Sequence, residues 1–176
     1  MLKLSAPLVN SPILSLRSGT TVAFTLRPII NPNNLKIEGF YCQDSIERNR
    51  ILVLLCQDIR EIALHGFVVD DHDVLVEESE LVRLQDIMAI NFALIGKQVV
   101  TVGKQKVGKV NDYAVDTDSM YIKKLYVDQP LYRSFLGGSL SVDRTQIIEV
   151  TDKKVIIQEP IQKIDARSSA TVRSIA

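Results

Sequence analysis

The stretch LKIEGFYCQD (residues 35–44) is repeated in outline by MYIKKLYVDQ (residues 120–129), 85 positions further along the 176-residue chain. In both stretches the apolar residues alternate and then change phase by one position, at Phe40 in the first and at Leu125 in the second. Side chains alternate along a strand with a period of two, so one extra residue, a β-bulge, is needed to keep the apolar set on the core face. The pattern therefore predicts a strand that bends at the same point in two copies of one unit.

The similarity extends into the neighbouring segments of both halves. The turn NPNN (31–34) aligns with DTDS (116–119), and QDIREI (57–62) aligns with TQIIEV (145–150) at an offset of 88. VVTVGKQKVGKV (99–110) has the pattern of two strands around a glycine-containing turn. Short strands separated by turns at roughly 8 to 12 residues are typical of small barrels and sandwiches. We predict an all-β fold with an internal repeat.

The repeat divides the chain into a first lobe (1–88), a second lobe (89–162) and a C-terminal tail (163–176). The tail loses apolar periodicity, and we expect it to be flexible. ESELVRLQDIMAINFALIG (78–96) has helical spacing of leucines, which predicts one or two short helical turns. The expected core residues share the apolar phase of the two strands: Ile37, Phe40, Cys42, Leu54, Ile122, Leu125, Val127 and Ile147.

Composition says more about the cellular compartment of the protein than about its function. Basic and acidic residues number 21 each, yet residues 1–88 carry 8 basic and 12 acidic side chains, and residues 89–176 carry 13 and 9. The asymmetry fits either a basic partner-binding lobe or two halves that attract each other. Two cysteines without a metal-binding spacing indicate a reducing compartment. With no apolar run of membrane-spanning length, we expect a cytoplasmic protein that is not inserted in a membrane.

Motif residues in the second half resemble those of the PRC-barrel family. They form an entry strand, a glycine hairpin, an aspartate turn and a final step: Gly96, Lys97, Val99, Lys106, Gly108, Val110, Asp112, Asp116, Ile147 and Val150. The first half fits less closely, since Ala23 stands in place of Gly108 and Pro28 in place of Tyr113. The resemblance implies two tandem small β-barrels. It also implies a docking or support role, as in the barrels of the ribosome maturation factor RimM and the reaction-centre H subunit, without catalytic residues.

Residues suited to catalysis or metal binding are sparse. His72 lies in the acidic segment 70–73, which could be a metal site or a solvated turn; aspartate is a preferred turn residue, and we favour the turn. LGGSLS (136–141) lacks the following helix that a phosphate-binding loop needs, so we predict a hairpin connection. We expect no catalytic, metal or cofactor site, no cofactor and no enzymatic activity.

A cluster of basic residues in the second lobe is the candidate partner-binding surface: Lys104, Lys106, Lys109, Lys123, Lys124, Arg133 and Arg144. The leading hypothesis is a non-catalytic adaptor or scaffold that acts through protein–protein contacts. The alternative is an RNA-linked factor of ribosome assembly or RNA processing that uses this surface. Aspartates alternate with the lysines, so a solvated surface of mixed charge explains the cluster equally well, and a homo-oligomer stays open.

Overall fold

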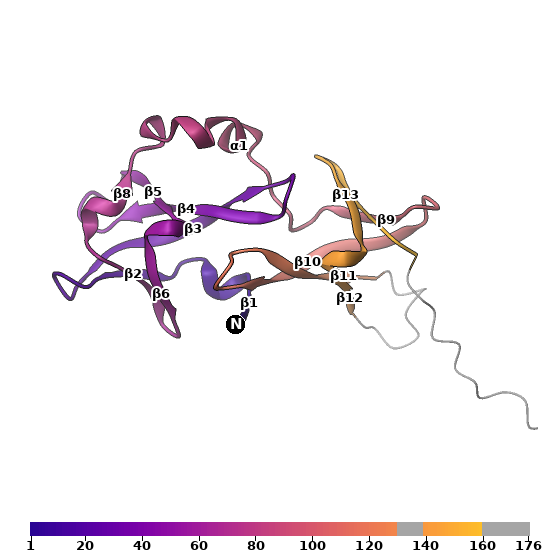
Figure 1. The fold of residues 1–176 in the computed structure, drawn as a ribbon, viewed down its shortest axis with the longest axis horizontal. Coiled ribbons are helices and arrows are strands. Elements are labelled where there is room, and N and C mark those ends of the chain that lie inside the picture. Colours follow the sequence, from indigo (N-terminus) through magenta and orange to yellow (C-terminus); the bar gives the residue numbers. More distant parts are fainter. Residues whose placement is uncertain (130–138, 160–176) are drawn as a thin grey trace, which may run out of the picture.

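The computed structural model describes residues 1–129 and 139–159, which form two seven-stranded β-sheets. Figure 1 shows the two sheets side by side along the long axis of the molecule, with helix α1 (Gln85–Ile90) over the first sheet. The predicted all-β class is confirmed. Helical structure in the described residues is limited to α1 and short 3-10 turns, as predicted for the segment between the halves.

The first sheet has the strand order β6-β7-β2-β3-β4-β5-β8. Its strands are β2 (Pro12–Ser15), β3 (Thr21–Asn31), β4 (Lys36–Asp44), β5 (Ile51–Leu55), β6 (Ile59–Ala63), β7 (Gly66–Val69) and β8 (Leu75–Val76).

The second sheet has the order β12-β11-β10-β9-β14-β13, with β1 also paired to β10. Its strands are β1 (Leu2–Leu4), β9 (Gln98–Thr101), β10 (Lys106–Asp116), β11 (Ile122–Asp128), β12 (Ser139–Asp143), β13 (Ile147–Val150) and β14 (Lys154–Ile157).

The two sheets repeat one design. Strands β2 to β7 occupy the same order as β9 to β14, and in each half the first and last of these strands pair in parallel. Thr25 lies opposite Cys42 as Val110 lies opposite Val127, so the pairing registers agree at an offset of 85 residues. The predicted bulges are confirmed, because both registers skip one residue of the bent strand, at Glu38 in β4 and at the equivalent position in β11.

The larger of two hydrophobic clusters draws side chains from both sheets, and the smaller one lies between α1 and the first sheet. Seven of the eight predicted core residues have exposed fractions of 0%. The eighth, Ile147, is half-buried and packs against the same cluster. Gly108 is needed for close approach, because a Cβ at this position would collide with the carbonyl oxygen of Asp128. The alternation of apolar residues therefore places the core correctly.

Neither sheet closes into a ring among the described strands, whose edges are β6 and β8 in the first sheet and β12 and β13 in the second. The expectation of tandem barrels thus stays a prediction. No helix in the described ranges is long and apolar enough to cross a membrane. The tail that was predicted to be flexible (163–176) lies outside the described residues. Arg133 and the first part of the LGGSLS segment lie outside them too.

Replacing Ile122 with alanine tests the core. Ile122 is 0% exposed and lies where the two halves meet, so we expect a loss of about 2–5 kcal/mol in the free energy of unfolding. Urea denaturation measures it, with Ile148→Ala as the control because Ile148 is 55% exposed. Equal losses for the two variants would contradict the assignment of Ile122 to the core.

Candidate binding site between the two halves

The two halves meet where the turns enter β4 and β11. The N–H of Ile37 donates to the carbonyl of Met120 at 2.9 Å, and the N–H of Ile122 donates to the carbonyl of Leu35 at 2.9 Å. Leu35 and Met120 both have left-handed backbones, with φ of 53° and 58°. Because each half gives the other the same hydrogen bond, the halves are related by an approximate two-fold axis at this contact.

The N-terminus of the chain crosses from the first half to the second. Strand β1 pairs antiparallel with Ala114–Asp116 of β10. Just after β1, the N–H and hydroxyl of Ser5 donate to Oδ1 of Asp112 at 3.2 and 2.5 Å. The same oxygen accepts the N–H of Tyr113 at 2.7 Å. This carboxylate therefore fixes the point at which the crossing segment leaves the second sheet.

The opposite side of the two-fold axis has a matching polar pair with the charge reversed. Arg27 occupies the position equivalent to Asp112 and donates to Oδ1 of Asn91 at 2.6 Å. Its guanidinium lies over the Tyr41 ring, 4.0 Å from the centroid. The chain before Asn91 is helix α1, whose Met88 packs against the face of the first sheet. The two crossing segments are thus alike at the polar pair and differ in the element that precedes it. Strand β1 precedes Ser5, whereas helix α1 precedes Asn91.

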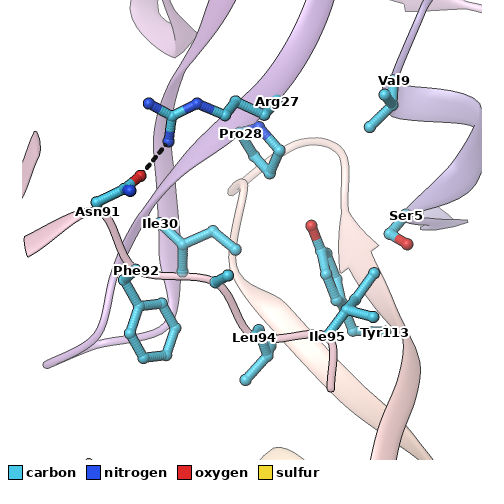
Figure 2. Close-up of a pocket in the computed structure, with 11 residues that line it drawn as sticks. Ser5, Val9, Arg27, Pro28, Ile30, Asn91, Phe92, Leu94, Ile95 and Tyr113 are labelled. Carbon is cyan, nitrogen blue, oxygen red and sulfur yellow. Dashed lines mark hydrogen bonds between the residues drawn. The ribbon is translucent and has the colours of Figure 1, made fainter. Parts of the chain in front are cut away.

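A pocket of about 440 Å³ lies between these two crossing segments. Its walls are largely apolar, and Figure 2 shows the residues that line it, which come from the segment before β2, from β3, from the segment after α1 and from β10: Val9, Pro28, Ile30, Phe92, Leu94 and Tyr113. Arg27 and Asn91 stand at one side, joined by their hydrogen bond (Figure 2). The volume is in the usual range for pockets that hold a small ligand or side chains of a partner.

The chemical groups of this pocket are suited to binding. Burial raises the pKa of the Tyr113 phenol, and the nearby Asp112 carboxylate adds to the shift, so the hydroxyl stays neutral at physiological pH. Figure 2 shows this hydroxyl directed toward Pro28. With Arg27 and Asn91, the pocket offers a phenol, a guanidinium and an amide around apolar walls. These groups fit a ligand that has an apolar part and a hydrogen-bond acceptor.

The two histidines and the two cysteines lie outside the lining of this pocket. Within residues 1–129 and 139–159, no three His, Cys, Asp or Glu side chains lie together as a metal site would require. His72 lies in a 3-10 turn between β7 and β8, as predicted, with Nε2 3.3 Å from Oδ1 of Asp44. Burial raises the pKa of both Cys42 and Cys56 to about 12, which keeps both thiols protonated.

The predicted basic surface is spread over two places. Lys104, Lys106 and Lys109 are exposed at the β9–β10 hairpin. Lys124 lies opposite Ala114, eight positions along β10 from Lys106, or roughly 26 Å at the usual strand rise. Lys106 at the hairpin and Lys124 on β11 therefore lie far apart along the strand, with Lys109 between them.

The second group of predicted residues has neighbours of its own. Lys123 and Lys124 are half-buried, and their charges contribute to the lowered pKa of Asp143, after the larger effect of the N–H and hydroxyl of Thr145. Arg144 lies over the Tyr121 ring, 4.9 Å from the centroid. These contacts involve β11, the neighbouring strand β12 and the 3-10 turn that follows β12.

The acidic turn of the first half is paired within that half. Asp70 forms a salt bridge with Arg60 at 2.5 Å, and Asp71 forms one with Arg17 at 2.8 Å. The hypothesis that the basic residues of the second half attract this turn has no support in these contacts. Its charges are balanced locally instead.

The pocket between the halves was not predicted as a binding site from the sequence. One signal was available, since the 85-residue offset places Arg27 against Asp112, opposite charges at equivalent positions of an internal repeat. Neither a scan against protein-family models nor a search of the curated proteins finds a match to this chain. Function has to be inferred from residues and geometry.

Replacing Asp112 with alanine tests the polar pair that anchors the N-terminal crossing. The change leaves the buried Ser5 hydroxyl and the Tyr113 N–H without their acceptor, and we expect a loss of about 1–3 kcal/mol in the free energy of unfolding. Asp112→Asn is the matched variant, since it retains an acceptor oxygen and should lose less. Urea denaturation measures both variants. Equal losses in the free energy of unfolding for Asp112→Ala and Asp112→Asn would show that the acceptor oxygen contributes nothing to stability.

Proposed function

We propose that the protein is a non-catalytic adaptor or scaffold, built as a tandem PRC-barrel-like repeat, that acts through protein–protein contacts. The observation that carries the proposal is the pocket between the halves. It combines apolar walls with a neutral phenol, an amide and a guanidinium, groups that bind and orient but supply no nucleophile with an adjacent base. The common register of the two sheets supports the tandem repeat.

The RNA-linked alternative receives less support. RNA binding without a recognised module relies on a continuous basic surface. The lysines of the hairpin lie far along β10 from those of β11, and Asp143 lies beside the second group. A salt titration separates the two functions, because contacts to phosphates weaken steeply as salt rises.

Affinity capture of the tagged full chain from the cells that express it tests the adaptor function. We expect a protein partner in near-equal amount that survives nuclease treatment and 0.3 M salt (roughly the range in which phosphate contacts fail). Loss of every co-purifying protein on nuclease treatment would favour the RNA-linked function instead.

The hairpin lysines are tested in the same capture by Lys104→Glu combined with Lys109→Glu. Both residues are exposed, so the free energy of unfolding should stay within about 0.5 kcal/mol of the unchanged protein. If the partner binds the hairpin, its recovery falls while stability is unchanged. Unchanged recovery would remove these residues from the interface.

A further inference from the structure

The hydroxyl of Tyr113 is a buried polar group without a hydrogen-bond partner. The side chain is 3% exposed, and Figure 2 shows its hydroxyl directed into the pocket between the halves, toward Pro28. Within residues 1–129 and 139–159, no group pairs with this hydroxyl, although the N–H of the same residue donates to Asp112 at 2.7 Å. Buried polar side chains nearly always have a partner, so an unpaired hydroxyl that faces a cavity points to a ligand.

The other polar side chains that line the pocket already have partners. The hydroxyl of Ser5 donates to Oδ1 of Asp112 at 2.5 Å. Arg27 donates to Oδ1 of Asn91 at 2.6 Å, and its guanidinium lies over an aromatic ring. Tyr113 is thus the one polar side chain of the described lining that makes no side-chain hydrogen bond.

The space in front of this hydroxyl exists because the repeat is not exact. Pro28 lies opposite Phe40 as Tyr113 lies opposite Leu125, so proline and tyrosine occupy equivalent positions of the two halves. Both side chains line the pocket (Figure 2). A proline ring is smaller than a phenol and carries no polar group, so it leaves room and offers the hydroxyl no partner. The cavity and the unpaired hydroxyl therefore have one cause.

The hydroxyl is suited to donate a hydrogen bond to a ligand. Burial raises the pKa of Tyr113, so the phenol keeps its proton. A donor needs an acceptor atom on the molecule that it meets. A carbonyl oxygen meets this need and brings no donor of its own, which would be costly to bury against apolar walls.

The rest of the pocket restricts the charge and the size of the ligand. Pro28, Ile30 and Leu94 are apolar, and burial of a charge against such walls is unfavourable. The cation at the side of the pocket, Arg27, is already bonded to Asn91. An apolar cavity of about 150 Å³ holds one benzene ring. A pocket of about 440 Å³ therefore accommodates two fused rings with a substituent.

From these observations we propose that the pocket between the halves binds a small uncharged molecule, an apolar ring system with a carbonyl oxygen that accepts the Tyr113 hydroxyl. The rings contact Pro28, Ile30 and Leu94. The inference goes beyond the proposed adaptor function, because it assigns a small molecule to the pocket and leaves the contacts of a protein partner to the surface outside it. Because both halves line the pocket, the ligand also holds them in one arrangement.

Fluorescence titration of the purified full chain tests the site. The probe is the neutral dye 6-propionyl-2-(dimethylamino)naphthalene, which has two fused rings and a ketone and whose emission moves to shorter wavelength in an apolar site. We expect saturable binding with a Kd below about 0.2 mM, the range that ligand efficiency gives for a molecule of this size. Emission that keeps its wavelength in water over the whole titration would overturn the proposal.

The variant Tyr113→Phe and a second probe together isolate the hydrogen bond. The second probe is the same dye with a CH2 group in place of the C=O. We expect Tyr113→Phe to weaken binding of the ketone about three- to tenfold, the contribution of one hydrogen bond, and to change the affinity for the second probe less than about twofold. Equal changes for the two probes would show that the hydroxyl does not bind the ligand, and the proposal would be wrong.

The same variant tests the unpaired state of the hydroxyl without any ligand. Tyr113→Phe removes a hydroxyl that has no partner among the described residues, so the melting temperature should not fall. A fall of several degrees would mean that the hydroxyl is bonded within the protein, which contradicts the proposal.

Two tryptophan variants locate the bound probe. Ala93 lines the pocket from an exposed position, and Ala93→Trp should fill the pocket and weaken binding of both probes at least tenfold. Leu64→Trp is the matched control, because Leu64 is 82% exposed and lies outside the pocket lining, and it should leave both affinities unchanged. Circular dichroism checks that each variant is folded. Equal binding to the two folded variants would place the probe elsewhere and overturn the assignment.

Affinity capture of the same variants separates this inference from the adaptor function. If neither probe binds and Ala93→Trp lowers the recovery of a protein partner, a side chain of that partner occupies the pocket and the small-molecule assignment is wrong. If neither probe binds and Ala93→Trp captures the partner normally, the adaptor function stands and this site is removed. Probe binding that depends on the Tyr113 hydroxyl, with no partner captured, would support the ligand site and remove the adaptor function.

Discussion

The exchange of two main-chain hydrogen bonds between the halves is the constraint on which the rest of the structure depends. Ile37 donates to Met120 and Ile122 donates to Leu35, within turns whose last residues are left-handed and buried. A left-handed backbone costs roughly 1–2 kcal/mol at a residue with a side chain, and burial of these apolar side chains offsets that cost. The contact fixes the orientation of one half relative to the other, and so it determines where β1 crosses and where the pocket forms.

The two-fold relation is broken at the segments that lead into each half. The first is a short alternating strand, LKL, which can pair along an edge; the second, QDIMAI, places apolar Ile87 and Met88 on one helical face and packs over the first sheet. Among residues 1–129 and 139–159, one edge is consequently covered by a strand and the other is not. Open edges invite uncontrolled pairing, and Pro28 limits it because proline has no N–H to offer. In the second half the N–H of the equivalent residue, Tyr113, is instead bonded to Asp112.

Sequence reasoning succeeded where the information is local. The bulges and the buried alternation of both bent strands follow from a period of two along each strand, and the offset of the repeat predicted their common register. The crossing of β1 could not be predicted in this way, since three residues with no turn signal pair with a strand more than a hundred positions away. The basic surface failed to form one patch for a related reason: the numbers of charges in each half do not say that Lys106 and Lys124 lie at different points along β10.

Because the core is common to both halves, binding between them affects the whole fold. The buried cluster contains residues from each sheet, among them Ile30 beside the pocket and Tyr113 across it. A partner that binds only the native arrangement stabilises it by RT ln(1 + [L]/Kd), about 2.7 kcal/mol at a hundredfold excess over Kd. The pocket is built from both halves, so this free energy opposes their separation as well as their unfolding. A protein whose sheets are filled by their own side chains can thus use the seam between two repeats for recognition, and partner occupancy would hold the repeats together.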